Sequence, residues 1–548
     1  MLPVAEPEII RTAMADGTEL VADLYRPADG GPYPVLVLRL PYGRAVASTV
    51  VLAHPAWYAA QGYLVLVQDV RGRGASGGRF RVLEDDVDDG AETLALAADL
   101  KGGNGQVASY GFSYHGMNQF MALSGAIRAG TRRPDAMAVV MAAWNVRDHW
   151  AYEGNAFRLQ ENREWARQMA VEVARRAGDE AVVAALLSGF SQAEASDVHP
   201  GLLQQASAYS HYADWLADDA AYWRRVSPDH ALEGLVPDLP VLHVGGWHDV
   251  MLEGTFAAFS AFSAKSRQQR LMIGPWTHIP WGRHSGALDC GPEAAEGVDR
   301  EIVGFFDEVL KGRELAQSPV RLYDAGKAGW RDFPTPPAVE TVTLFPGSNG
   351  RAATTSHDGW LMPEPQQACT DFLVHDPWRP APAHGLHLGA PYGFADRCMV
   401  DDRADVAVYT SPPLAEALVL CGAADLAVNI TSDRPGFDLC CMLSMVTPDA
   451  RAIAITGGYR TLLKEEKSQP FAMTLRPAMM TVPAGYRLRL SLQASAFPAF
   501  AVNPGSGRPA HQSPAQQAEV TTLRIMTGAE AASRLTLPIL PPSGLIFA

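Results

Sequence analysis

The stretch Gln106-Val-Ala-Ser-Tyr-Gly-Phe-Ser-Tyr-His-Gly-Met-Asn-Gln-Phe120 decides the fold of this chain. It begins as an apolar run of strand length, turns around Ser113 and continues with apolar residues at helical spacing, so we expect strand, tight turn and helix. A serine at such a corner is held on a strained backbone with its hydroxyl clear of the sheet. Ser113 is therefore a candidate nucleophile, although His115 stands where the usual Gly-x-Ser-x-Gly pattern has its second glycine, which follows here as Gly116.

Further apolar runs of strand length lie on both sides of this stretch and alternate with helical patterns. They are found at residues 63–69, 136–143, 238–249 and 270–278. Such an alternation predicts an α/β fold, a mostly parallel sheet with helices on both faces. Ligands of these sheets bind beyond the carboxyl ends of the strands, which is where Ser113 would lie.

The rhythm of the chain changes twice, which predicts three parts. Residues 146–231 carry long helical patterns rich in aromatic side chains, so we expect a helical cap inserted between two pieces of the α/β domain, 1–145 and 232–318. Beyond residue 319 helical patterns nearly vanish, and short β-rich runs recur between turn signals. Residues 319–548 are therefore predicted to form an all-β sandwich, with a jelly roll as the best match.

Composition limits the classes of partner. The chain has 548 residues and a net charge of −15, from 45 Lys and Arg against 60 Asp and Glu. This acidic balance argues against nucleic acid and anionic membranes as partners. The first residues lack the pattern of a signal peptide, and no segment reaches membrane-spanning length, so a cytoplasmic protein is expected. The six cysteines include no Cys-x-x-Cys pair, so we expect neither disulfides nor a metal site.

Two other strand ends deliver residues that could serve Ser113. Asp249 follows a Gly-Gly turn after the run that begins at 238, and His278 follows a Gly-Pro turn after the run that begins at 270. A serine hydroxyl needs an adjacent base to take its proton, and the base needs an acid to fix its tautomer. The order Ser, Asp, His is typical of α/β-hydrolases, so we predict that the three side chains converge. His248, beside Asp249, is a weaker candidate for the base.

Five segments taken together resemble the cocaine esterase / Xaa-Pro dipeptidyl-peptidase (CocE/NonD) family of serine hydrolases. The segments are Leu40-Pro-Tyr42, Gln68-Asp-Val-Arg-Gly-Arg-Gly-Ala-Ser-Gly-Gly-Arg-Phe80, Gly111-Phe-Ser-Tyr-His-Gly116, Gly245-Gly-Trp-His-Asp249 and Ile273-Gly-Pro-Trp-Thr-His278. The resemblance implies an α/β-hydrolase domain with a helical cap and a C-terminal jelly roll, and it covers the whole chain.

The resemblance also implies roles for individual residues. Ser113 would be the nucleophile, His278 the general base and then acid, and Asp249 the residue that orients the imidazole. The hydroxyl of Tyr42 and the backbone N–H of Tyr114 would form the oxyanion hole. No metal or organic cofactor is implied.

The activity expected from these residues is cleavage of a carboxylic ester or amide through an acyl-enzyme, of the esterase or acylase type. The alternative is an Xaa-Pro dipeptidyl-peptidase-like aminopeptidase, because Glu153, Glu161 and Glu164 of the cap could face a free N-terminus. An alternative from another class is a carbohydrate-binding protein whose hydrolase domain is inert. The partner would be a small ester, amide or short peptide, and the sandwich could also support a homodimer.

The substrate pocket is expected beneath the cap. The aromatic content of the cap would suit an apolar or aromatic acyl group. The candidates for the pocket lining are His115, Trp150, Tyr152, Phe157 and Trp247.

Overall fold

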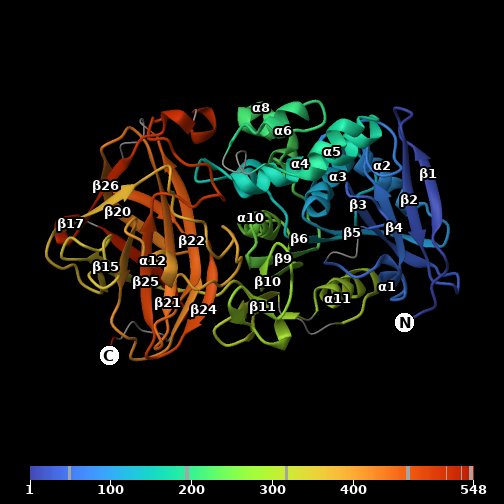
Figure 1. The fold of residues 1–548 in the computed structure, drawn as a ribbon. Helices are drawn as coiled ribbons and strands as arrows, with labels where there is room; N and C mark the ends of the chain where they lie inside the picture. Colours follow the sequence, from blue (N-terminus) through green and yellow to red (C-terminus); the bar gives the residue numbers. More distant parts are fainter. Residues whose placement is uncertain are drawn as a thin grey trace.

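The chain forms an α/β part, a helical segment that covers one edge of it, and an all-β part beside both (Figure 1). The structure is a computed structural model that describes residues 1–46, 51–191, 197–295, 297–314, 319–463, 470–513, 515–531, 533–541 and 547.

Ten strands of the described residues build the sheet of the α/β part. In spatial order they are β1 (Glu8–Ala13), β2 (Glu19–Tyr25), β4 (Leu64–Asp69), β3 (Tyr33–Leu40), β5 (Gly103–Phe112), β6 (Ala136–Val140), β9 (Val241–His248), β10 (Gln269–Thr277), β13 (Val320–Asp324) and β14 (Gly329–Phe333). The strands from β4 to β13 run parallel, while β1, β2 and β14 pair antiparallel at the two edges. The predicted α/β fold is confirmed.

The sheet continues past residue 319, where the sequence led us to place the start of the all-β domain. β13 pairs parallel with β10, and β14 closes the edge as a hairpin with β13. A short β-rich run such as Val320–Asp324 has the same composition whichever sheet it joins, because strand propensity reports a pleated, half-buried surface and not a partner. The sequence pattern therefore could not assign this hairpin to the α/β part.

Helices cover both faces of this sheet. α2 (Asp86–Ala98), α3 (Tyr114–Ala129) and α10 (Leu252–Ser263) pack on one face, and α1 (Pro55–Ala59) and α11 (Val298–Lys311) pack on the other. Strands such as β4 and β6 are buried along their whole length, which explains their continuous apolar sequences.

The segment inserted between β6 and β9 is mainly helical and lies along the upper edge of the view in Figure 1. It consists of a π-helical turn (Arg147–Ala151), the short hairpin of β7 (Tyr152–Glu153) and β8 (Ala156–Phe157), and the helices α4 (Leu159–Arg176), α5 (Glu180–Ser188), α6 (Gly201–Gln205), α7 (Tyr212–Ala217), α8 (Ala220–Val226) and α9 (Pro228–Ala231). Its aromatic side chains pack against one another and against α3, so the segment shares one hydrophobic core with the α/β part.

The C-terminal part is built from strands that pair mainly antiparallel around an apolar core of its own. They are β15 (Glu340–Gly347), β16 (Trp360–Met362), β17 (Cys369–His375), β18 (Val406–Thr410), β19 (Leu418–Gly422), β20 (Asp425–Ser432), β21 (Phe437–Val446), β22 (Ala452–Leu462), β23 (Phe471–Thr474), β24 (Ala478–Val482), β25 (Arg487–Gln493), β26 (Thr521–Thr527) and β27 (Arg534–Ile539), with one short helix, α12 (Cys398–Asp401). The predicted all-β C-terminal domain is confirmed.

The all-β part is joined to the α/β part by a shared apolar cluster and by buried polar contacts. Trp247 and Leu252 pack with Met479 and Leu540, and Asp324 accepts hydrogen bonds from the backbone and hydroxyl of Thr481 at 2.8 and 2.5 Å. A small hairpin of β11 (His284–Ser285) and β12 (Leu288–Asp289) also reaches the all-β part, because Gly286 pairs with Phe394.

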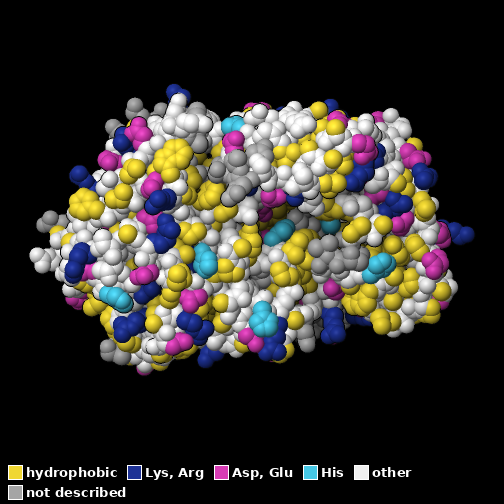
Figure 2. Space-filling model, in the orientation of Figure 1, with side chains coloured by type: hydrophobic (Ala, Val, Ile, Leu, Met, Phe, Trp, Pro, Cys, Tyr) yellow, Lys and Arg dark blue, Asp and Glu magenta, His cyan; other side chains and the backbone are white. Residues whose placement is uncertain are grey.

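The outer surface carries charged side chains of both signs, dispersed among apolar ones, and the face in Figure 2 is hollowed near its centre, below the helical segment. Within the described residues, none of the helices combines the length and the apolar character needed to cross a bilayer.

Candidate active site

Ser113 stands at a sharp corner between β5 and α3. Its backbone has φ of 62° and ψ of −122°, a conformation that costs a non-glycine residue about 1–3 kcal/mol. The chain can turn so tightly because Gly111 and Gly116 leave room. A Cβ on Gly111 would lie 2.5 Å from the Cβ of His115, and a Cβ on Gly116 would lie 2.7 Å from that of Ala142. Gly116, which follows the usual position of the second glycine by one residue, therefore packs against the segment that follows β6.

The side chains of Ser113, His278 and Asp249 form one chain of hydrogen bonds. His278 Nε2 lies 3.0 Å from Ser113 Oγ, and His278 Nδ1 lies 2.6 Å from Asp249 Oδ1. Asp249 directly follows β9 and is fully buried, and His278 directly follows β10. The parallel register of these neighbouring strands brings their carboxyl ends to the same edge as the elbow.

His278 is held in place by more than its two polar partners. The ring of Phe112 packs on it with a centroid separation of 4.6 Å, and Trp281 Nε1 donates to its backbone carbonyl at 3.0 Å. Burial alone would lower the pKa of His278, but the negative charge and hydrogen bond of Asp249, helped by Glu161, raise it above its usual value. The imidazolium form is thus stabilised by the residues around it.

Tyr42 and Tyr114 line the same cavity as Ser113, and each carries a hydrogen-bond donor. Tyr42 follows β3, and its hydroxyl oxygen accepts a hydrogen bond from Trp165 Nε1 at 3.1 Å. Because the indole N–H occupies a lone pair of that oxygen, the hydroxyl proton is left for another acceptor. Burial raises the pKa of Tyr42, so it is a neutral donor near pH 7. Tyr114 is the first residue of α3, where a backbone N–H has no acceptor within the helix.

The side chain of Tyr114 fixes the start of α3 through hydrogen bonds of its hydroxyl group. Its hydroxyl donates to Asp86 Oδ2 at 2.7 Å and accepts from the backbone N–H of Leu83 at 3.0 Å. Asp86 is in turn paired with Arg39 at 2.8 Å in the interior. A buried polar network therefore holds the first residue of α3, and with it the backbone N–H of Tyr114.

Two cavities meet at His278. The first, of about 360 Å³, is mostly apolar, and the second, of about 420 Å³, is more polar and reaches the all-β part. The lining of the first includes Tyr42, Phe112, Ser113, Tyr114, His115, Met117, Trp150, Glu161, Trp165 and His278. The lining of the second includes Arg158, Glu161, Glu164, Trp165, His248, His278, His387 and Tyr392.

The structure places the predicted pocket residues in two groups. His115 and Trp150 line the first cavity. Tyr152 and Phe157 instead pack on each other in the core of the helical segment, where the Tyr152 hydroxyl donates to the carbonyl of Trp215 at 2.9 Å. Trp247 points away from the site, and its Nε1 donates to the carbonyl of Tyr323 at 2.7 Å. The prediction that these last three residues line the pocket is corrected.

The two other histidines near the serine are unsuited to the role of base. Burial lowers the pKa of both His115 and His248 to about 3. His248 packs edge-on against Phe394 with a centroid separation of 4.2 Å, and His115 packs beside Tyr42 at 5.4 Å. Both rings are therefore neutral packing groups at the rim of the cavities.

Trp165 and Glu161, on neighbouring turns of α4, line both cavities. The sequence patterns do not single out Trp165 for the site, and they suggest Glu161 only as a possible partner of a peptide N-terminus. Their spacing of four residues puts them on one helix face, which was the available signal. Within the described part of the chain, no group of three or more His, Cys, Asp and Glu side chains is arranged to hold a metal ion.

Two family models match the chain. Residues 16–280 match X-Pro dipeptidyl-peptidase (S15 family), and residues 315–536 match the X-Pro dipeptidyl-peptidase C-terminal non-catalytic domain. Among curated proteins, cocaine esterase of Rhodococcus sp. (strain MB1 Bresler) is 27% identical over 573 residues, which cover 97% of this chain and 98% of the relative.

Solved structures share the whole fold. An alpha-amino acid ester hydrolase superposes with a TM-score of 0.77 at 19% identity, covering 98% of this chain and 97% of the other. An aminopeptidase from the marine sediment archaeon Thaumarchaeota archaeon superposes with a TM-score of 0.79 at 19% identity, covering 97% and 96%. At this identity the likeness shows a common architecture of all three parts.

Proposed function

Because the chain belongs to the X-Pro dipeptidyl-peptidase (S15) family of serine hydrolases, we propose that it cleaves carboxylic esters or amides through an acyl-enzyme on Ser113. This is the family that the sequence motifs resemble. The observation that carries the proposal is the unbroken hydrogen-bonded series Ser113–His278–Asp249 at the edge of an apolar cavity.

In the first half-reaction His278 takes the proton of Ser113 as the oxygen attacks the substrate carbonyl. Negative charge then develops on the carbonyl oxygen, which accepts hydrogen bonds from the Tyr42 hydroxyl and the Tyr114 backbone N–H. His278 returns its proton to the leaving group as the bond breaks. Water repeats the cycle on the acyl-enzyme, and Asp249 holds the imidazole in the required tautomer throughout.

The two cavities suit the two halves of such a substrate. The apolar cavity contains Ser113 and both oxyanion donors, so it takes the acyl group. The polar cavity opens on the other side of His278, where a leaving group receives its proton, so it takes the alcohol or amine. Trp150, Trp165 and Met117 would favour an aromatic or branched acyl chain in the first cavity.

A second candidate function, release of N-terminal dipeptides, is favoured by Glu161. Its carboxyl group is shared by both cavities and lies near enough to His278 to raise the pKa of the imidazole. Burial raises the pKa of Glu161 itself, and a cationic substrate group placed beside the carboxyl would lower that pKa again. A free α-amino group on the acyl side would supply that charge.

The carbohydrate-binding alternative gains no support from this site, because an inert hydrolase has no need for an assembled serine, histidine and aspartate. The homodimer and the cytoplasmic location expected from the sequence stay predictions. Size-exclusion chromatography with light scattering would test the first.

The proposal is tested with matched substrates: p-nitrophenyl acetate, phenylacetate and phenylglycinate, with alanyl-prolyl p-nitroanilide as the dipeptide substrate. We expect cleavage of the aryl esters by the native protein and none above background by Ser113→Ala. Cleavage of alanyl-prolyl p-nitroanilide that is lost in Glu161→Gln would favour release of N-terminal dipeptides. A preference for phenylglycinate over phenylacetate that disappears in the same variant would instead indicate that Glu161 binds an α-amino group on the acyl residue itself. Equal rates with native protein and Ser113→Ala would refute both.

A further inference from the structure

We infer that Arg476, which belongs to the all-β part, is a positioning residue for the hydrolytic reaction because its guanidinium holds the turn that carries Asp249. The inference rests on the proposed function of Ser113, His278 and Asp249 and extends it to a residue 227 positions beyond Asp249. It gives the all-β part a direct share in building the active site.

The guanidinium of Arg476 bonds to the main chain of this turn. Its Nη2 donates to the carbonyl oxygen of Asp249 at 2.6 Å and to that of Val250 at 3.1 Å. The Arg476 side chain is buried, with 2% of its surface exposed, so water does not compete for these bonds. Charge-assisted hydrogen bonds of this kind are roughly twice as strong as neutral ones.

The position of this turn matters because the Asp249 side chain has little else to fix it. Oδ1 is bonded to His278, while Oδ2 is buried without a hydrogen-bond partner in the described part of the chain. The place of the carboxylate is therefore decided by its main chain. There the Asp249 N–H donates to the carbonyl of Gly246 at 3.0 Å, and the Asp249 carbonyl accepts from the backbone N–H of Leu252 at 3.2 Å and, at the shorter distance of 2.6 Å, from Arg476.

Arg476 can act as a fixed support because its own backbone is tied to the β-sheet. It lies in the connection between β23 and β24, where its N–H donates to the carbonyl of Gly457 at 3.0 Å. Its carbonyl accepts a hydrogen bond from the hydroxyl of Thr456 at 2.5 Å. Both partners belong to β22, so the guanidinium projects from a rigid element.

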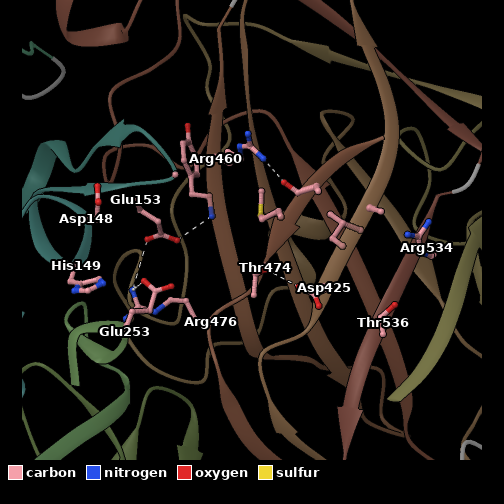
Figure 3. A pocket seen from close by; sticks show the side chains of 16 residues that line it. Asp148, His149, Glu153, Glu253, Asp425, Arg460, Thr474, Arg476, Arg534 and Thr536 are labelled. Atoms are coloured by element: carbon pink, nitrogen blue, oxygen red, sulfur yellow. Dashed lines mark hydrogen bonds and ion pairs between the residues drawn. The ribbon is translucent and has the colours of Figure 1, made fainter. Parts of the chain in front are cut away.

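Two glutamates balance the charge of Arg476 at the junction of the three parts. Figure 3 shows it close to Glu153 and Glu253, and its Nη1 lies 3.9 and 3.8 Å from their carboxylates, beside a cavity of about 670 Å³. Burial alone would raise the pKa of Glu153, but its contacts with His387 and Arg158 hold the pKa below its usual range. The carboxylate is thus charged, and it lets Arg476 stay buried beside Asp249.

The test compares Arg476→Met and Arg476→Lys with Arg397→Met. Arg397 is a control of matched burial within the all-β part, where it donates to the carbonyl of His384 and to the side chain of Gln493, away from the site. We expect Arg476→Met to lower kcat on the order of 10²-fold with KM within about threefold, since a shift of the acid misaligns the base. Arg476→Lys should recover part of kcat, and Arg397→Met should keep it.

Two readouts separate positioning from a general loss of structure or charge. The charged groups that face His278 are Asp249 and Glu161. If Arg476→Met displaces Asp249, the pKa of His278 falls and the acid limb of the pH profile of kcat/KM moves to lower pH. If the substitution only removes the positive charge of Arg476, the pKa of His278 rises and the same limb moves to higher pH. The far-downfield proton resonance of the His278–Asp249 hydrogen bond should also be lost in Arg476→Met and kept in Arg397→Met.

A native kcat with a native resonance in Arg476→Met would overturn the inference, as would an equal loss in both variants. The resonance does not require turnover. If the native protein failed to hydrolyse any ester while the resonance still depended on Arg476, the proposed function would fail and the positioning role would stand.

Discussion

The substitution Tyr42→Phe separates transition-state stabilisation from substrate binding. The hydroxyl of Tyr42 accepts a hydrogen bond from Trp165 Nε1 at 3.1 Å and lines the cavity that contains Ser113. With its lone pair engaged, its proton is available to the oxyanion that forms during attack. The substitution removes this donor and leaves the ring and the cavity walls unchanged.

The magnitude follows from the geometry. Loss of one preorganised oxyanion donor costs about 3 kcal/mol of barrier, or 10²–10³-fold in kcat. The backbone N–H of Tyr114 remains, so a residual rate well above background is expected. The ground-state carbonyl makes a weaker hydrogen bond than the oxyanion, and KM should change less than about threefold. The unpaired indole N–H of Trp165 lowers the free energy of unfolding by about 1 kcal/mol.

The assay is steady-state hydrolysis of p-nitrophenyl phenylacetate at neutral pH. Tyr152→Phe serves as the control, because its hydroxyl bonds to a carbonyl inside the helical segment, behind the cavity. We expect native kcat from the control. A Tyr42→Phe variant with native kcat, or one that raises KM and leaves kcat unchanged, would refute the assignment of this hydroxyl to the oxyanion.

Two further predictions concern protonation and the elbow. The contacts with Asp249 and Glu161 raise the pKa of His278 above its usual value, and the base must be neutral to act, so kcat/KM should fall as the pH drops through this raised pKa. Glu161→Gln removes one of the two negative charges and should move the acid limb of the pH–rate profile to lower pH; an unmoved limb would contradict this. Gly111→Ala should lower kcat/KM on the order of 10²-fold, because the added Cβ would lie 2.5 Å from the Cβ of His115. Gly329→Ala is the control and should match the native rate, because its added Cβ would have its nearest neighbour at 3.8 Å. Equal rates for the two variants would contradict the elbow geometry.

Much of the site could be predicted from the sequence because its residues stand directly after strands. An apolar run that ends in a turn marks both the strand and the place where its carboxyl end delivers a side chain. Ser113, Asp249 and His278 each carry that local signal, and the topology of a parallel sheet brings such ends to one edge. In the structure His278 lies within hydrogen-bonding distance of both Ser113 and Asp249.

The remaining features depend on contacts between distant segments. Tyr152 and Phe157 have the composition of pocket residues, but an aromatic side chain in a helical segment looks the same in sequence whether it faces the cavity or the core. Trp247 precedes Asp249 by two residues yet points to β13, because Trp247 still belongs to β9 whereas Asp249 lies beyond the end of that strand, where the regular alternation of side chains no longer holds. Arg476 carries no local signal, since its partner is a backbone carbonyl in another domain.

The most direct test of the central claim is to identify the residue that becomes acylated. The protein is mixed with excess p-nitrophenyl phenylacetate, quenched in acid within the first turnover, and digested for mass spectrometry. We expect one phenylacetyl group on the peptide that contains Ser113, with no such adduct and no turnover in Ser113→Ala. An acyl group on another residue, or native turnover by Ser113→Ala, would contradict it.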